Sequence, residues 1–266
     1  MNFGLKEKVV LVTGASRGIG KAIAAAFAAE GSIVVLNARN QQELEQVAQE
    51  IQRCGGHALA LAADVTNASE AQYLAEQALA RFGTIHVLVN NVGGADGFAS
   101  FEELSDESWI NVFNLNVLST VRLIRAVLPS MRQQHWGRII NISSEAGTQP
   151  DPVMPHYNAS KAAITNLTKT LSKAYGRDGI LVNTVSPGWT RTPLTEAIFA
   201  TQAEAQGITL HEFEQAFLRE SRPHLALSRA GTPAEVASAV VYLASEAASF
   251  ITGTNLRVDG GSVTSI

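Results

Sequence analysis

The order of apolar and helix-forming segments constrains the fold of this chain more than any other feature. Short runs of Val, Ile and Leu alternate with longer, Ala-rich segments that have helical apolar spacing. Strands are expected at 9–12, 33–36, 57–61, 85–89, 138–142, 180–185 and 255–258, and helices at 18–30, 41–53, 67–82, 106–133, 156–177 and 232–245. This alternation predicts a parallel sheet with helices on both faces. Right-handed crossovers then give a doubly wound α/β sheet of about seven strands in one domain, 1–266.

Residues 192–228 interrupt this alternation. The segment is helical in character but does not lead directly into a strand. An insertion of this length beside a sheet is typical of a binding loop, so we expect a mobile substrate lid over 192–228. Its charged residues are expected on solvated helix faces, which include Glu214 and Arg222. The excess of glutamate over arginine in the segment argues against docking of an acidic carrier protein.

Composition limits the partners and the location. The chain is 46% hydrophobic with a formal net charge of −4, which excludes intrinsic disorder and provides no general attraction to nucleic acid. The apolar stretches are shorter than a membrane span needs, and the N-terminus does not resemble a signal peptide. The single Cys54 fits a reducing compartment, and the histidines lack metal-ligand spacing. We therefore expect a cytoplasmic protein without a metal site.

A glycine-rich turn follows the first expected strand and opens the first expected helix. Glycine permits a tight turn in which backbone N–H groups approach a phosphate, and the helix N-terminus adds a positive dipole end. In this context the turn predicts a dinucleotide site rather than a purely structural bend. The predicted cofactor contacts are Gly14, Ser16, Arg17, Gly18, Ile19 and Gly20.

The end of the second expected strand indicates which dinucleotide binds. A protein that prefers NAD places Asp or Glu there to bond the ribose 2′-hydroxyl, but this chain has Asn37 and Arg39 and no acid before Glu43. Arg39, assisted by Arg17, suits the 2′-phosphate because bonds between guanidinium and phosphate are strong. The alternative is that both arginines are solvated surface residues. We expect NADP(H) to be preferred over NAD(H).

Tyr157 and Lys161 stand four positions apart on one face of an expected helix. A phenol is a poor acid–base catalyst near neutral pH, but a nearby ammonium lowers its pKa. Ser144 ends the fifth expected strand, where a hydroxyl is placed to hold a substrate oxygen. Asn116 lies inside an apolar helical stretch, where Asn needs a partner. His156, beside Tyr157, is interpreted as an exposed residue at a helix start.

Together these features resemble the short-chain dehydrogenase/reductase family, which has a Rossmann-type fold, over about Lys8 to Gly261. The resemblance implies that further residues border the cofactor, namely Asp64, Val65, Asn91, Gly93, Pro187, Gly188, Thr190 and Thr192. Val92 departs from the family pattern, in which Ala is usual.

The resemblance also implies the catalytic roles. Ser144 would orient the substrate oxygen, and Tyr157 would exchange its proton. Lys161 would bond the nicotinamide ribose and tune Tyr157, and Asn116 would support a water relay from Lys161 to solvent. Substrate contacts are expected from Glu145, Met154 and Trp189. A homotetramer is implied, with a dimer as the alternative.

The sequence therefore predicts an NADP(H)-dependent oxidoreductase that interconverts a ketone, or a 3-oxoacyl group, and a secondary alcohol. An NAD(H)-dependent dehydrogenase of a small alcohol, polyol, sugar or steroid is the first alternative. A regulator that binds NADP without turnover is a remote one, because it has no need of Ser, Tyr and Lys together. The expected partner is a small carbonyl or alcohol substrate, without nucleic acid or membrane.

Overall fold

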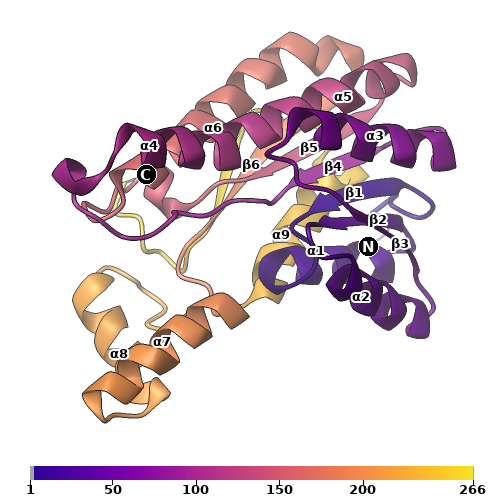
Figure 1. The fold of residues 1–266 in the computed structure, drawn as a ribbon. Coiled ribbons are helices and arrows are strands. Elements are labelled where there is room, and N and C mark those ends of the chain that lie inside the picture. The colour runs from indigo at the N-terminus through magenta and orange to yellow at the C-terminus, as the bar shows by residue number, and fades with distance from the viewer. Residues whose placement is uncertain (1–2, 266) are drawn as a thin grey trace.

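Seven parallel strands form one sheet in the order β3-β2-β1-β4-β5-β6-β7 (Figure 1). This computed structural model describes residues 3–265. The strands are β1 (Val9–Thr13), β2 (Ile33–Ala38), β3 (His57–Ala62), β4 (Val87–Asn90), β5 (Gly137–Ile142), β6 (Ile180–Pro187) and β7 (Asn255–Val258). The chain runs from β1 outward to β3 and then crosses back to β4 on the other side of β1. This reversal confirms the predicted doubly wound fold.

The central strands are buried because helices cover both faces of the sheet. Every residue of β1, β4 and β5 is buried. In β1, Val10 and Val12 pack into one apolar core, whereas Val9 and Leu11 pack into the other. Alternate side chains therefore enter two cores, which is why these strands are continuously apolar in sequence.

Two helical layers enclose the sheet (Figure 1). The layer on one face consists of α1 (Gly18–Ala29), α2 (Gln41–Arg53) and α9 (Pro233–Ala244). The layer on the other face consists of α3 (Ala68–Phe82), α5 (Ser119–Gln133) and α6 (Pro155–Tyr175). Asn40 and Asn67 cap α2 and α3 because their side-chain oxygens accept first-turn N–H groups. These caps fix where each helix begins after its strand.

The segment expected as one helix over 106–133 is divided in the structure. It consists of α4 (Asp106–Phe113), a π-helical turn at Asn114–Leu118, and α5. Apolar periodicity does not signal this insertion, because the pattern continues through it. By length and composition the whole segment could cross a membrane. In the fold, however, Leu123, Val127 and Met131 of α5 lie in the core beside the sheet.

Residues 192–228 contain two helices that stand apart from the sheet (Figure 1). They are α7 (Pro193–Gln206) and α8 (Leu210–Ser221), and Thr192 and Thr209 form capping boxes at their N-termini. A small apolar cluster of its own holds the pair together, formed by Phe199, Ala203 and Phe213 with Trp189 and Phe217 packed against it. The helical character predicted from sequence is therefore present. The mobility of this lid stays a prediction.

Candidate active site

The candidate site lies where the carboxyl ends of four adjacent strands meet. Gly14 follows β1, Asn91 follows β4, Ser144 follows β5, and Gly188 follows β6. Parallel pairing of these strands brings the four ends to one edge of the sheet. The edge includes the point between β1 and β4 at which the strand order reverses, where ligands bind in doubly wound sheets.

The glycine turn has a conformation that larger residues would not adopt. Gly14 and Gly18 have φ angles of +63° and +57°, and a Cβ on Gly20 would lie 2.1 Å from the Gly14 carbonyl oxygen. Asn91 fixes the turn, because its Nδ2 donates to the carbonyl oxygen of Thr13 at 2.9 Å. Side chains at these glycine positions would occupy the space inside the turn, and α1 begins within the turn, at Gly18. The turn therefore has the space and the helix N-terminus that the phosphates of a dinucleotide require.

The ends of β2 and β3 fit the adenosine part of such a cofactor. Arg17 and Arg39 are exposed, and their side chains form no hydrogen bond or ion pair with residues 3–265. Asn37 is buried and donates to the carbonyl oxygens of Leu61 and Ala63, both at 3.1 Å, which joins the two strand ends. The two guanidinium groups therefore remain available to an anionic ligand.

Asp64 and Val65 follow β3 in a tight turn. Asp64 Oδ1 accepts the backbone N–H of Thr66 at 2.9 Å and its hydroxyl at 2.7 Å. Val65 is buried in the core. The carboxylate that the family resemblance places beside the adenine is therefore held by its own turn and is only partly exposed.

Ser144 and Tyr157 bring two hydroxyl groups together. Tyr157 lies in the first turns of α6, and its hydroxyl forms a hydrogen bond with the Ser144 side chain. Burial raises the pKa of Tyr157, the Ser144 bond lowers it, and the charge of Glu145 raises it again. The net shift is upward, so the lowered phenol pKa expected from sequence is not present in the protein alone. The physical reason is that desolvation disfavours the phenolate more than the neighbouring groups favour it.

Lys161 lies buried beneath the tyrosine. Its Nζ is 5.6 Å from the centre of the Tyr157 ring and donates to the carbonyl oxygen of Ile142 at 2.9 Å. Burial lowers the pKa of Lys161 to about 8. A Cβ on Gly93 would lie 2.9 Å from this Nζ, so glycine leaves the space in which the ammonium sits. The Tyr–Lys pairing on one helical face is thus present in the structure.

Asn116 sits in the π-helical turn and is buried there. Its Nδ2 donates to the Gly94 carbonyl oxygen at 3.0 Å and to Ser160 Oγ at 2.9 Å, and its Oδ1 accepts the Gly94 N–H at 3.0 Å. A Cβ on Gly93 would lie 2.7 Å from that Oδ1. Asn116 therefore has the partners its position requires. It joins α6 to the strand end beside Lys161.

The connection from β6 to α7 passes beside these groups. The Gly188 N–H donates to the Val258 carbonyl oxygen at 3.0 Å, and the Thr190 hydroxyl donates to the Gly188 carbonyl oxygen at 3.0 Å. Thr192 caps α7 through Thr195. The hydroxyls of Thr190 and Thr192 are thus engaged within the loop. Pro187 ends β6, so the loop starts at the carboxyl edge of the sheet.

An ion pair that the sequence analysis missed joins the lid to the site. Arg222, just after α8, donates from Nε to Glu145 Oε1 at 3.0 Å, and its Nη1 lies 3.5 Å from Asp151 Oδ2. The Arg222 and Glu145 side chains are only 16% and 8% exposed. The expectation that Arg222 is solvated was therefore wrong. The partners are 77 positions apart, and no local pattern connects residues at such a distance.

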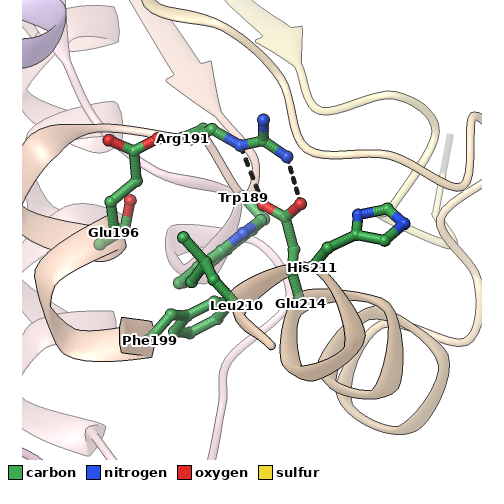
Figure 2. A pocket seen from close by; sticks show the side chains of 8 residues that line it. Trp189, Arg191, Glu196, Phe199, Leu210, His211 and Glu214 are labelled. Atoms are coloured by element: carbon green, nitrogen blue, oxygen red, sulfur yellow. Dashed lines mark hydrogen bonds and ion pairs between the residues drawn. The ribbon is translucent and has the colours of Figure 1, made fainter. Parts of the chain in front are cut away.

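A cavity of about 240 Å³ lies between α7, α8 and the loop after β6. Figure 2 shows the side chains that line it. Glu214 is buried there and forms an ion pair with Arg191, with 3.1 Å between Glu214 Oε1 and Arg191 Nε. The solvated position expected for Glu214 was wrong, because α8 turns this residue toward the loop. Trp189 stacks on Phe199 with 4.6 Å between ring centres. Trp189 therefore lines this cavity and packs against the lid. Its contact with substrate stays a prediction.

Two residues near Tyr157 complete the site. Met154 is half-buried and immediately precedes α6. His156 is fully buried against Trp109, and neither ring nitrogen has a hydrogen-bond partner among residues 3–265. The interpretation of His156 as exposed was wrong because α4 packs over the start of α6. No group of three or more His, Cys, Asp or Glu in the described chain could hold a metal ion.

Fold and site together define a class of protein: a doubly wound α/β domain whose Ser, Tyr and Lys meet beside a glycine-rich dinucleotide turn. The profile of the short chain dehydrogenase family matches residues 8–203, and the chain belongs to this family. It is an oxidoreductase that acts on carbonyl or alcohol substrates.

Comparison with individual proteins agrees with this assignment. The chain is 40% identical to a 3-oxoacyl-[acyl-carrier-protein] reductase of Synechocystis sp., over 97% of this chain and 98% of that protein. The structure of L-sorbose reductase from Gluconobacter frateurii with NADPH and L-sorbose superposes with a TM-score of 0.96, 34% identity and complete coverage of both chains. A 7α-hydroxysteroid dehydrogenase with NADH superposes with a TM-score of 0.88 and 34% identity, over 99% of this chain and 97% of that one.

Proposed function

We propose that the protein is an NADP(H)-dependent reductase that interconverts a ketone, or a 3-oxoacyl group, and a secondary alcohol. The observation that carries this proposal is the pair of hydroxyls on Ser144 and Tyr157 above the buried Lys161. They form one acid–base group at the sheet edge where the glycine turn also lies. A protein that only sensed the cofactor would not need this arrangement.

The residues divide the work of the reaction. The glycine turn and the loop after β6 would hold NADP(H), which when bound would supply or accept the hydride at the substrate carbon. Ser144 donates a hydrogen bond to the carbonyl oxygen, and Tyr157 protonates that oxygen as it becomes an alcohol. A general acid in hydrogen-bond reach contributes about 10²–10⁴-fold. Lys161 lies beside Tyr157 and bonds the end of β5, and Asn116 joins α6 to Gly94 after β4. In this proposal both residues support proton resupply to Tyr157.

Arg39 and Arg17 support the choice of NADP(H). Both guanidinium groups are exposed and have no hydrogen-bond or ion-pair partner within residues 3–265, and the sequence at the end of β2 provides no carboxylate to accept the 2′-hydroxyl of NAD. L-sorbose reductase, which binds NADPH, is a structural neighbour. The runner-up is an NAD(H)-dependent dehydrogenase of a polyol or steroid, which the NADH-bound steroid dehydrogenase favours.

Tyr157→Phe tests the catalytic assignment. The variant removes only the phenol oxygen, so it should lose turnover by about 10²-fold or more while NADPH still binds. We would measure cofactor binding by fluorescence, and turnover with a panel of ketoses, cyclic ketones, 3-oxoacyl thioesters and oxosteroids. Tyr175→Phe, on the far end of the same helix, is the control and should keep full activity. Substantial kcat in Tyr157→Phe with saturating cofactor contradicts the assignment.

The same panel, run with NADPH and NADH in parallel, separates the candidate functions. Higher kcat/KM with NADPH supports the proposal, and higher kcat/KM with NADH favours the runner-up. Binding of NADPH without oxidation on any substrate would favour a cofactor sensor.

A further inference from the structure

The two carboxylate oxygens of Glu145 have different surroundings. Oε1 accepts a bond from Arg222 Nε at 3.0 Å. Oε2 is buried and has no hydrogen-bond partner among residues 3–265. Only 8% of the side chain is exposed. Burying a carboxylate oxygen without a hydrogen-bond donor costs free energy. Oε2 is therefore a candidate acceptor for a donor group on a bound ligand.

This free oxygen lies beside the reacting groups. Glu145 directly follows Ser144, and its charge acts on the phenol of Tyr157. A Cβ on Gly188 would lie 3.0 Å from Oε2, so this oxygen faces the loop after β6. A substrate whose carbonyl oxygen is bonded by Ser144 and Tyr157 would extend its neighbouring carbon atoms toward this loop.

Arg222 fixes the chemical character of the acceptor. A guanidinium only donates hydrogen bonds, and its contact with Oε1 holds the Glu145 carboxylate in one orientation. An ionised carboxylate only accepts. It suits an O–H donor and disfavours an ether oxygen or a second carboxylate at the same place.

We propose that Glu145 Oε2 accepts a hydrogen bond from a hydroxyl group of the substrate, so that the enzyme selects hydroxyketones and the corresponding diols. The inference rests on the proposed function, because it places the substrate carbonyl at Ser144 and Tyr157. Sites built to bond a hydroxyl reject analogues without it strongly, since their buried polar group is then left unpaired. Glu145 is thus a specificity-determining residue.

The first test compares substrates that differ in one hydrogen-bond donor. Butan-2-one is the parent, and 1-hydroxy-, 3-hydroxy- and 4-hydroxybutan-2-one are each paired with their methyl ether. The ether keeps the electron-withdrawing oxygen and replaces the O–H donor with a methyl group, whose bulk the Glu145→Gln comparison below controls for. For at least one pair, the hydroxyketone should have a kcat/KM about 10- to 100-fold above its ether. Equal values for all three pairs would overturn the inference.

The second test changes the acceptor. In Glu145→Gln, Arg222 retains the amide oxygen because it needs an acceptor, and the amide NH₂ then takes the place of Oε2. The preference for the hydroxyketone over its ether should fall to near unity. The lost charge could also affect Tyr157 or the folded fraction. Such effects act equally on both substrates, so they cancel in the ratio of the two kcat/KM values. Glu214→Gln neutralises another buried carboxylate, paired with Arg191, and should keep the wild-type ratio.

The remaining outcomes are distinct. A preference that survives in Glu145→Gln overturns the inference. Weaker NADPH binding in Glu145→Gln with an unchanged preference would assign Oε2 to the carboxamide of the cofactor and also overturn it. Absence of turnover with every ketone and diol, with either cofactor, would overturn the proposed function instead.

Discussion

At the scale of single residues, burial controls the chemistry of the site. Lys161 is an amine enclosed by protein, and Tyr157 is a phenol whose desolvation outweighs the bond from Ser144. Sequence spacing predicted that these side chains meet, but it gave the wrong direction for the tyrosine pKa. Spacing along a helix shows which residues are neighbours. It does not show how much water reaches them.

Lys161 should make the stability of the protein depend on pH. Its pKa is about 8 when folded, against 10.5 ordinarily, so the unfolded chain binds more protons between these values. The penalty for burying the amine is therefore complete below pH 8 and disappears as the pH rises toward 10.5. The stability of wild type relative to Lys161→Met should rise by about 2 kcal/mol between pH 7 and pH 9.5.

Urea unfolding of both proteins without cofactor, at several pH values, measures this difference. Titratable groups distant from Lys161 contribute equally to both proteins and cancel in the comparison. A difference that does not change with pH would contradict the lowered lysine pKa.

Arg39 should decide the cofactor. Hydrogen bonds to charged groups contribute roughly 1.5–3 kcal/mol, so Arg39→Ala should weaken use of NADPH by about 10- to 100-fold. NADH has no 2′-phosphate, so the kcat/KM with NADH should change little. Arg39→Asp should lower the kcat/KM with NADPH more than Arg39→Ala does, because its carboxylate repels the 2′-phosphate. The same carboxylate can accept a hydrogen bond from the 2′-hydroxyl of NADH. The measurement is kcat/KM for both cofactors.

Arg53→Ala is the matched control, since Arg53 is an exposed arginine at the other end of α2. It should leave both cofactors unaffected. Equal losses for NADPH and NADH in Arg39→Ala would mean that Arg39 has only a structural role. A wild type that already prefers NADH would refute the NADP assignment.

At the scale of elements, the sequence predicted the strands and most helices because the two have different apolar patterns. The strands are short continuous apolar runs, and the helices have helical apolar spacing. Two features were not predictable in this way. The π-helical turn at Asn114–Leu118 lies inside an unbroken apolar pattern. The contact between Arg222 and Glu145 depends on how α8 returns to the sheet, which only the tertiary fold determines. His156 was misplaced for the same reason, because the packing of α4 against α6 buries it.

Arg222 should anchor the lid. Arg222→Ala leaves the Glu145 carboxylate buried without its cation, and loss of one partner of a buried pair typically costs about 3–5 kcal/mol. We expect lower stability in urea and faster hydrogen exchange of the α8 amides. In wild type, residues 192–228 should exchange faster than the sheet and slow when NADPH and substrate are bound.

Arg229→Ala provides the comparison, since it removes an exposed ion pair with Glu235 and should change neither measurement. Unchanged exchange in Arg222→Ala would mean that the apolar cluster around Phe199 alone holds the lid. Lid amides as protected as those of the sheet, without ligands, would contradict a mobile lid.

At the scale of the whole molecule, several large apolar side chains stand exposed near α4. Phe98, Phe101 and Ile110 are 66%, 67% and 67% exposed. Several exposed apolar side chains near one helix suit contact with another subunit. We predict a homotetramer, with a mass of four 28.3 kDa chains in analytical ultracentrifugation.

Ile110→Asp should shift this mass toward smaller species, because it places a charge in the apolar surface. Glu107→Gln, on the same helix, is the control and should keep the wild-type mass. A wild-type monomer at micromolar concentration would contradict the prediction.

The ion pair between Arg222 and Glu145 also limits how this enzyme could be recombined with its relatives. The lid resembles a cassette that could be exchanged to alter selectivity, because it has its own apolar cluster. Arg222, just after α8, however, forms an ion pair with Glu145, a residue 77 positions earlier. A chimera with a foreign lid that lacks the arginine would inherit an unmatched buried charge. The lid and residue 145 should therefore be exchanged together in a chimera and varied together in directed evolution.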